Sequence, residues 1–267
     1  MFFSKKKKIN EMVGGEKGQQ FITAIISAVS TNPQLAECDH STILSAALVG
    51  QALNLSPSPQ LGQYYMVPFN DNKRGCKVAQ FQIGYKGYIQ LAIRSGYYKK
   101  LNVLAIKEGE LVKYDALNED IEVKLIEDEE EREKAPTIGY YAMFEYLNGF
   151  RKTLYWTKKH MEAHAEKYSM GYKAHKGYTF WEKDFDGMAY KTMLRQLISK
   201  WGIMSVDMQK AMESDMAEIK EDGTYEYVDN EFEVTESIQE ETQQEQQAVT
   251  ENTEDNSTNE DDPFLQK

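Results

Sequence analysis

Apolar residues recur at helical spacing in two segments near the start of the chain. Residues 18–31 place five apolar side chains on one side, and the Asn-Pro pair at 32–33 ends the pattern. Residues 41–53 show a second apolar face, followed by a proline-containing connector at 54–59. We therefore expect two helices whose apolar faces need packing partners.

Two strand-like runs follow, at 64–69 and 76–83. The six residues between them, Asn-Asp-Asn-Lys-Arg-Gly, are rich in turn formers. This arrangement predicts a β-hairpin whose tip carries Lys73 and Arg74.

The stretch 84–95 predicts a helix with two distinct faces, because its residues repeat at intervals of three and four. The apolar face comprises Tyr85, Ile89, Ala92 and Ile93. The polar face carries Lys86, Gln90 and Arg94. Gly96 stands where a helix-ending glycine is common.

The next part of the chain predicts strands. Their ranges are 101–106, 121–126, 138–147 and 150–156. Asn148-Gly149 between the last two is typical of a two-residue hairpin turn. The acidic run at 127–136 predicts a solvated loop.

Three helices are expected after the strands, at 158–168, 183–201 and 206–219. In the second, Tyr190, Leu194, Leu197, Ile198 and Trp201 form the inward face. Lys191 and Arg195, four residues apart, face elsewhere. The order of elements predicts an α+β fold: N-terminal helices, a core of hairpin, helix and strand with further antiparallel strands, C-terminal helices and a disordered acidic tail.

Charge divides the chain by position. The formal net charge is −12, but residues 211–267 hold 19 acids and 2 bases, which leaves residues 1–210 with a net charge of +5. We expect a flexible basic N-terminus at 1–17, one folded domain at 18–205, a weak helix or linker at 206–220, and a disordered tail at 221–267. Such a polyanionic tail would compete with other polyanions for a basic surface.

Cysteine usage and hydropathy predict a soluble protein of the reducing cytoplasm. The two cysteines, Cys38 and Cys76, have neither the spacing of a metal knuckle nor the number of a disulfide framework. The start of the chain lacks the features of a secretory signal, and no apolar run approaches the roughly 18 residues of a membrane span.

Catalytic motifs are sparse, and we expect neither enzymatic activity nor a cofactor. The sequence contains no GxxxxGK[ST] phosphate-binding loop. His160 and His164 lie four residues apart on a predicted helix, but a third metal ligand is unassigned and the glutamate does not fit HExxH. We therefore predict no metal site. A metal-dependent nuclease built on these histidines is a third, weaker reading.

Cations and aromatic residues alternate in three segments, at 80–100, 150–159 and 169–181. Cations neutralise phosphates and flat rings accept bases, so this combination suits single-stranded nucleic acid. In any single segment the same residues are typical of strand packing and solvated helix faces. Three such segments in one domain favour binding.

The order of residues in two segments is more specific. The sequences SAALVGQALNLSPSPQLGQYYMVPF at 45–69 and FQIGYKGYIQLAIRSG at 81–96 closely resemble the RecT family of phage single-strand DNA annealing recombinases. The resemblance runs from about residue 20 to 205. It implies that 18–205 is a DNA-binding and oligomerising annealing domain, which works without ATP in the cytoplasm of a bacterial host cell. It also implies assembly into rings or filaments and cooperation with a 5′→3′ exonuclease. In such an assembly the apolar faces of 21–29 and 43–53 would either meet a neighbouring subunit or cover the sheet of their own subunit. A host single-strand-binding protein is a further expected partner.

An annealing protein needs a basic groove that holds one DNA backbone extended while the bases stay open to a second strand. The candidate DNA-binding residues are Lys73, Arg74, Lys86, Arg94, Lys99, Lys100, Arg151, Lys152, Trp156, Lys173, Lys176, Phe180, Lys191 and Arg195. The alternative function is passive single-strand binding or scaffolding with the same groove but without annealing.

Overall fold

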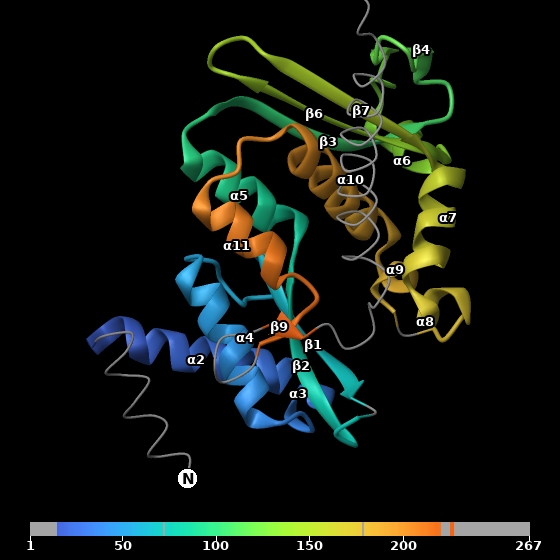
Figure 1. Ribbon diagram of the computed structural model, residues 1–267. Helices are drawn as coiled ribbons and strands as arrows, with labels where there is room; N and C mark the ends of the chain where they lie inside the picture. Colours follow the sequence, from blue (N-terminus) through green and yellow to red (C-terminus); the bar gives the residue numbers. More distant parts are fainter. Residues whose placement is uncertain (1–14, 72, 178, 220–224, 227–267) are drawn as a thin grey trace, which may run out of the picture. The chain divides into compact units, whose positions relative to one another are not determined.

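The computed structural model describes residues 15–71, 73–177, 179–219 and 225–226, all within a unit that spans residues 1–228 (Figure 1). Our expectations of a flexible basic N-terminus and a disordered acidic tail therefore fall almost entirely outside the described residues. Two positions of the expected tail are described: Tyr225–Glu226 form a short strand, β9.

Three helices open the described chain: α2 (Gly15–Thr31), α3 (Pro33–Ala36) and α4 (His40–Ala52). The short α3 was not predicted, because we took Pro33 only as the end of the preceding helix, whereas proline also suits the first position of a new one. The Asp39 side chain caps α4 by accepting a hydrogen bond from the Ser41 N–H.

The predicted hairpin is present as β1 (Tyr64–Asp71) and β2 (Cys76–Ile83), paired antiparallel in full register. α4 packs on β2, and its Thr42 hydroxyl accepts the Ala79 N–H at 2.8 Å. The apolar face of α4 therefore covers the hairpin of its own subunit. On α2, by contrast, Ile26 remains exposed.

Helix α5 (Tyr85–Ser95) follows β2 directly and ends at Gly96, whose φ is 74°. The start of α5 packs against the backbone of the connector that precedes β1. A Cβ at Gly87 would lie 2.1 Å from the carbonyl oxygen of Gln63. The close approach explains why glycine stands at this position of the Gly-Tyr-Lys-Gly sequence.

The main sheet contains β3 (Tyr98–Lys107), β6 (Thr137–Tyr146) and β7 (Arg151–Thr157), antiparallel in the order β3-β6-β7. Its inner face packs on α10 (Phe185–Trp201) (Figure 1). The β6–β7 turn is wider than the predicted two-residue turn, since the Tyr146 N–H donates to the Phe150 carbonyl. Within it only Gly149 has a positive φ, of 87°.

A second small hairpin joins β3 to β6. It consists of β4 (Leu111–Asp115) and β5 (Asp120–Val123), followed by α6 (Glu129–Lys134). The prediction of a solvated loop here was wrong in part, because Arg132 anchors a helical turn by pairing with the buried Glu110 at 2.6 Å. The acidic side chains of α6 remain exposed.

The C-terminal helices are α7 (Lys158–Tyr168), α8 (Met170–Lys173), α9 (Phe180–Lys183), α10 and α11 (Val206–Ser214). The prediction that Trp201 points inward was wrong, because its ring is exposed. Helix α11 is shorter than predicted, since β8 (Glu218–Ile219) pairs with β9 and the preceding residues join β2. There the Met216 N–H donates to the Phe81 carbonyl at 2.8 Å.

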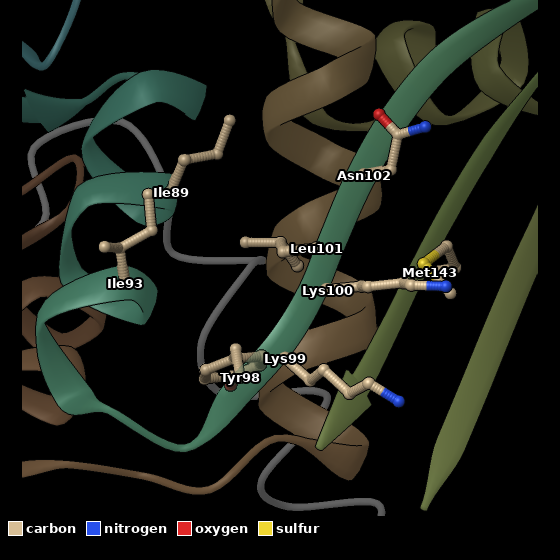
Figure 2. Close-up of a pocket in the computed structure, with 8 residues that line it drawn as sticks. All are labelled: Ile89, Ile93, Tyr98, Lys99, Lys100, Leu101, Asn102 and Met143. Carbon is tan, nitrogen blue, oxygen red and sulfur yellow. The ribbon is translucent and has the colours of Figure 1, made fainter. Parts of the chain in front are cut away.

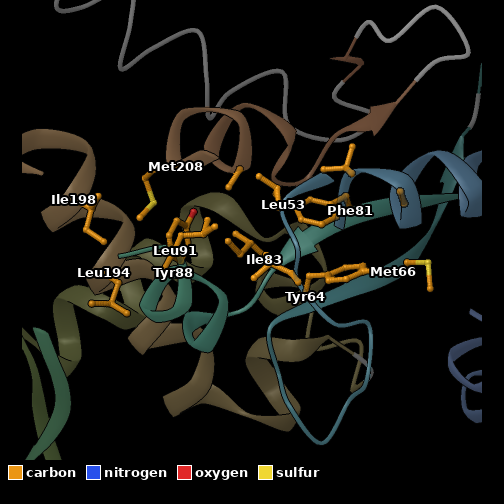
Figure 3. Packing of buried hydrophobic residues seen from close by; sticks show 14 of the residues in the cluster. Leu53, Tyr64, Met66, Phe81, Ile83, Tyr88, Leu91, Leu194, Ile198 and Met208 are labelled. Carbon is orange, nitrogen blue, oxygen red and sulfur yellow. The ribbon is translucent and has the colours of Figure 1, made fainter. Parts of the chain in front are cut away.

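A continuous core joins these elements. Figure 3 shows Tyr88 and Leu91 of α5 between Ile83 of β2 and the α10 residues Leu194 and Ile198. The α+β fold class is confirmed. Among the described residues, no helix is both long and apolar enough to cross a membrane.

Candidate nucleic-acid interface

An open groove of about 470 Å³ lies along the outer edge of β3, beside α5. Its lining residues are Ile89, Ile93, Tyr98, Lys99, Lys100, Leu101, Asn102 and Met143. Figure 2 shows Ile89 and Ile93 on α5 opposite Leu101, while Lys99 and Lys100 project from the other side of the strand. The groove thus combines an apolar wall with two lysines, a combination suited to bases and phosphates respectively.

The exposed face of α5 extends this groove toward the helix start. Lys86 and Ile93 are exposed, and they lie two helical turns apart on one side of the helix. Ile93 is 61% exposed, although it belongs to the predicted apolar face of the helix. Helical spacing identifies an apolar face. It does not show how much of that face another element of the fold covers.

Aromatic side chains gather at the start of α5. A Cβ at Gly62 would lie 3.1 Å from the Tyr65 hydroxyl and 3.4 Å from Lys86 Cδ, so both side chains flank this glycine. The Phe180 ring lies 5.7 Å from that of Tyr65. Burial, with a smaller contribution from Asp184, raises the pKa of Tyr65. The structure therefore brings Lys86 and Phe180 to the same end of α5.

At the other end of α5, cations form a row across the outer face of the sheet. Lys100 and Arg151 are both register partners of Glu145, from the strands on either side of it. Lys99 Nζ lies 2.5 Å from Glu145 Oε1 and holds the pKa of that carboxyl below its usual range. One carboxylate is thus shared among three cations, which leaves excess positive charge beside the groove.

Lys152 and Trp156 belong to the opposite, inner face of the sheet. Lys152 pairs with Glu119, and its ammonium lies 3.8 Å from the centre of the Trp201 ring. Trp156 stacks on His160 with ring centres 4.2 Å apart. Because they lie on the inner face, neither side chain belongs to the row of cations beside the groove. Both also have partners within the protein.

Lys191 and Arg195 correct the sequence prediction most clearly. Lys191 is only 5% exposed, and its ammonium lies 2.9 Å from Asp215 Oδ1. Arg195 pairs with Asp215 Oδ2 at 2.6 Å, and the same carboxylate accepts the Ile83 N–H. Lys191 therefore cannot reach a phosphate in this conformation, because it neutralises a buried acid.

Three further predicted cations lie away from the groove or are held by other groups. Arg94 donates to the carbonyl of Leu53 at 2.6 Å, at the end of α4. Arg74 pairs with Asp39 at 2.7 Å. Lys73 and Arg74 occupy the tip of the first hairpin, about 25 Å along the strands from α5.

Lys173 and Lys176 are exposed in and just after α8. The chain runs from them to Phe180, whose ring contacts Tyr65. They therefore lie on the segment that leads toward the start of α5.

The two histidines considered as metal ligands lie among aromatic rings. Burial lowers the pKa of His164 to about 4, and His160 contributes further. The centre of the His164 ring lies 4.5 Å from that of the Tyr168 ring. Within the part of the chain that the structure describes, no group of three or more His, Cys, Asp or Glu side chains is arranged to hold a metal.

Comparison with known proteins gives the family. The model of the RecT family matches residues 19–236. This chain belongs to the RecT family. It is 30% identical over 202 residues to protein RecT of Escherichia coli K12, covering 75% of this chain and 72% of that protein. It is also 43% identical over 256 residues to the uncharacterized protein YqaK of Bacillus subtilis 168, covering 95% of this chain and 81% of that protein.

Membership confirms the resemblance drawn from the two motif segments and supports a general role in DNA recombination by single-strand annealing. The sequence reasoning missed Ile89, Ile93 and Asn102 as groove residues. A strand edge next to a helix is a tertiary feature, so cation and aromatic spacing alone did not reveal it.

Proposed function

We propose that this RecT-family protein is an ATP-independent single-strand DNA annealing protein. Oligomers of the chain hold one DNA strand along the α5–β3 groove and pair it with a complementary strand. The observation that carries this proposal is the groove itself, with Ile89, Ile93 and Leu101 beside Lys99 and Lys100. Lys86 extends the cationic track toward the start of α5, and Arg151 extends it across the sheet.

Annealing of this kind needs no nucleotide hydrolysis, because duplex formation is downhill by about 1.4 kcal/mol per base-pair step in stacking alone. The barrier is repulsion between the two backbones and pairing within each strand. Lysines on one side of an apolar wall neutralise phosphates without enclosing the bases. We further propose a 5′→3′ exonuclease and a host single-strand-binding protein as partners that supply and protect the strand.

The proposal is tested with the variant Lys86→Ala/Lys99→Ala/Lys100→Ala. We expect weaker binding to single-stranded DNA of every sequence, and a slope of log affinity against log salt that flattens by roughly 0.7 per lost phosphate contact. Lys134→Ala is the matched control, since this exposed lysine lies on the acidic helix α6 and pairs with Glu130. Unchanged affinity and slope in a folded triple variant would refute the groove assignment.

Pairing of complementary oligonucleotides, measured in EDTA and without ATP, separates annealing from the alternative of passive binding. An annealing protein accelerates pairing above the protein-free rate, and the triple variant loses that acceleration. A passive binding protein or scaffold binds the strands and leaves the rate unchanged or lower.

A further inference from the structure

The α5–β3 groove ends at a surface that carries exposed aromatic rings. Among the described residues, the exposed Phe, Tyr and Trp side chains are Tyr97, Tyr114, Phe150, Phe180 and Trp201. Tyr97 directly precedes β3, and Phe150 directly precedes β7. These two side chains are 48% and 45% exposed. We call them the hairpin-end rings, because they lie where β6 turns into β7.

Backbone contacts place the hairpin-end rings on either side of the end of β6. The Leu147 N–H donates to the Tyr97 carbonyl at 3.1 Å, and the Tyr146 N–H donates to the Phe150 carbonyl at 2.8 Å. Adjacent strands lie about 4.8 Å apart, so the two backbones are separated by roughly 10 Å across β6. The Phe150 ring also stacks on Tyr146, with centres 5.9 Å apart. The two rings therefore belong to one surface.

This surface continues the groove. Tyr98 lines the groove and follows Tyr97 directly. The Tyr98 ring lies 5.0 Å from the ring of Tyr146, on which Phe150 stacks. Figure 2 shows Tyr98 and Lys99 at the end of the groove where β3 begins. A DNA strand that leaves the groove at this end therefore meets the hairpin-end rings next.

Cations accompany the hairpin-end rings. Lys99 Nζ and Lys100 Nζ lie 2.5 and 3.7 Å from the two carboxylate oxygens of Glu145, and Arg151 is the register partner of Glu145 on β7. One carboxylate does not balance three cations, so excess positive charge remains beside the rings. Exposed rings with neighbouring cations are the combination that holds unpaired bases and their phosphates.

Trp201 is exposed on the same end of the sheet but has other contacts. The ammonium groups of Lys152 and Lys200 lie 3.8 and 5.7 Å from the centre of its ring. No ring-to-cation contact of this kind involves Tyr97 or Phe150 among the described residues. We therefore restrict the assignment to the two hairpin-end rings.

We propose that Tyr97 and Phe150 stack on bases of the single strand where it leaves the groove. The inference rests on the proposed function, since it assigns further contacts to the same strand. A base that stacks on a ring cannot also stack inside a hairpin of its own strand, and its pairing edge stays open. The hairpin-end rings therefore oppose pairing within the strand, which is one of the two barriers to annealing.

Three variants test these contacts. Tyr97→Ser/Phe150→Ser removes both rings and no cation. Tyr97→Trp/Phe150→Trp keeps a ring at each position and adds two fluorescent probes. Tyr114→Ser is the matched control, because this 40% exposed tyrosine lies on β4 and does not line the groove. Circular dichroism melting verifies that each variant is folded, and sedimentation velocity without DNA measures assembly.

Anisotropy of a labelled oligothymidylate, measured at several salt concentrations, reports binding. We expect Tyr97→Ser/Phe150→Ser to bind at least about fivefold more weakly per lost ring. The slope of log affinity against log salt should stay that of the parent, because stacking neutralises no phosphate. Tyr114→Ser should match the parent in affinity and slope. In Tyr97→Trp/Phe150→Trp, oligothymidylate should quench the fluorescence that the two new tryptophans add.

Annealing provides a readout that a merely structural role of the rings would not move. Two pairs of complementary oligonucleotides are compared at saturating protein, one pair with internal hairpins and one without. We expect Tyr97→Ser/Phe150→Ser to lose more of the acceleration for the hairpin-forming pair than for the other. Tyr97→Trp/Phe150→Trp should keep the parent's rates for both pairs.

Parent affinity in a folded Tyr97→Ser/Phe150→Ser variant would overturn the proposal, as would a flattened salt slope or equal losses for the two pairs of oligonucleotides. Absence of quenching in Tyr97→Trp/Phe150→Trp would overturn it even if the serine variant does not fold. Weaker self-assembly with unchanged DNA affinity would show that the rings meet protein instead. Failure of the groove is distinct, because Lys86→Ala/Lys99→Ala/Lys100→Ala then keeps the parent's slope, whereas failure of the rings alone leaves that slope flattened.

Discussion

Replacement of Asp215 tests how the C-terminal segment is held on the domain. Asp215 is 2% exposed and accepts from three donors: Lys191 at 2.9 Å, Arg195 at 2.6 Å and the Ile83 N–H at 3.0 Å. In Asp215→Asn the side chain can still accept from Ile83, but the buried ammonium of Lys191 loses its counter-charge. Removing one partner of a buried pair costs about 3–5 kcal/mol.

We therefore expect Asp215→Asn to lower the free energy of unfolding by about 3 kcal/mol. In a protein of this size that corresponds to a fall in Tm of about 6–12 °C. The second change Lys191→Met should recover part of the loss, at least about 1 kcal/mol, because it removes the stranded charge. Arg195 is partly exposed and can be solvated. Urea unfolding followed by circular dichroism measures all three proteins.

The same variants decide the role of Lys191 in DNA binding. Lys191→Met alone should leave both the affinity for single-stranded DNA and its salt dependence unchanged, because the ammonium is buried. Our reasoning fails if the double variant loses as much free energy of unfolding as the two single variants lose together. It also fails if Lys191→Met flattens the salt dependence.

Three further outcomes are expected. Burial holds the pKa of His164 at about 4, below its ordinary 6.5, so the unfolded chain binds its proton first and the free energy of unfolding falls as pH drops between these values. His164→Phe should remove this part of the pH dependence, and the exposed His175→Asn should keep it. Gly87→Ala should destabilise the fold by about 1–3 kcal/mol in thermal melting, because its Cβ meets the Gln63 backbone, whereas Gln90→Ala should not. Removing residues 237–267, which hold nine acids and one base, should tighten DNA binding at low salt and leave binding at high salt unchanged; equal affinities at low salt would contradict a competing tail.

Local pattern determined much of the secondary structure. Turn-forming residues between two alternating runs set the first hairpin, and helical spacing set α4, α5 and α10. These features depend on neighbours within a few residues, so the sequence displays them directly. The family resemblance also rested on local sequence. The proline-containing connector and the glycines at the start of α5 are near each other in the chain, and they pack together.

The location of each candidate side chain depended on residues far away in the chain. Lys86 and Lys191 look alike in sequence, as lysines on the polar side of a helix, yet the first is exposed and the second is buried against Asp215, 24 residues later. The groove arises because the edge of β3 lies beside α5, and Ile93 stays exposed there although its spacing places it on the apolar face of the helix. Helical periodicity determines which residues share a face, whereas tertiary packing determines whether that face is covered, and only the structure supplies the covering elements.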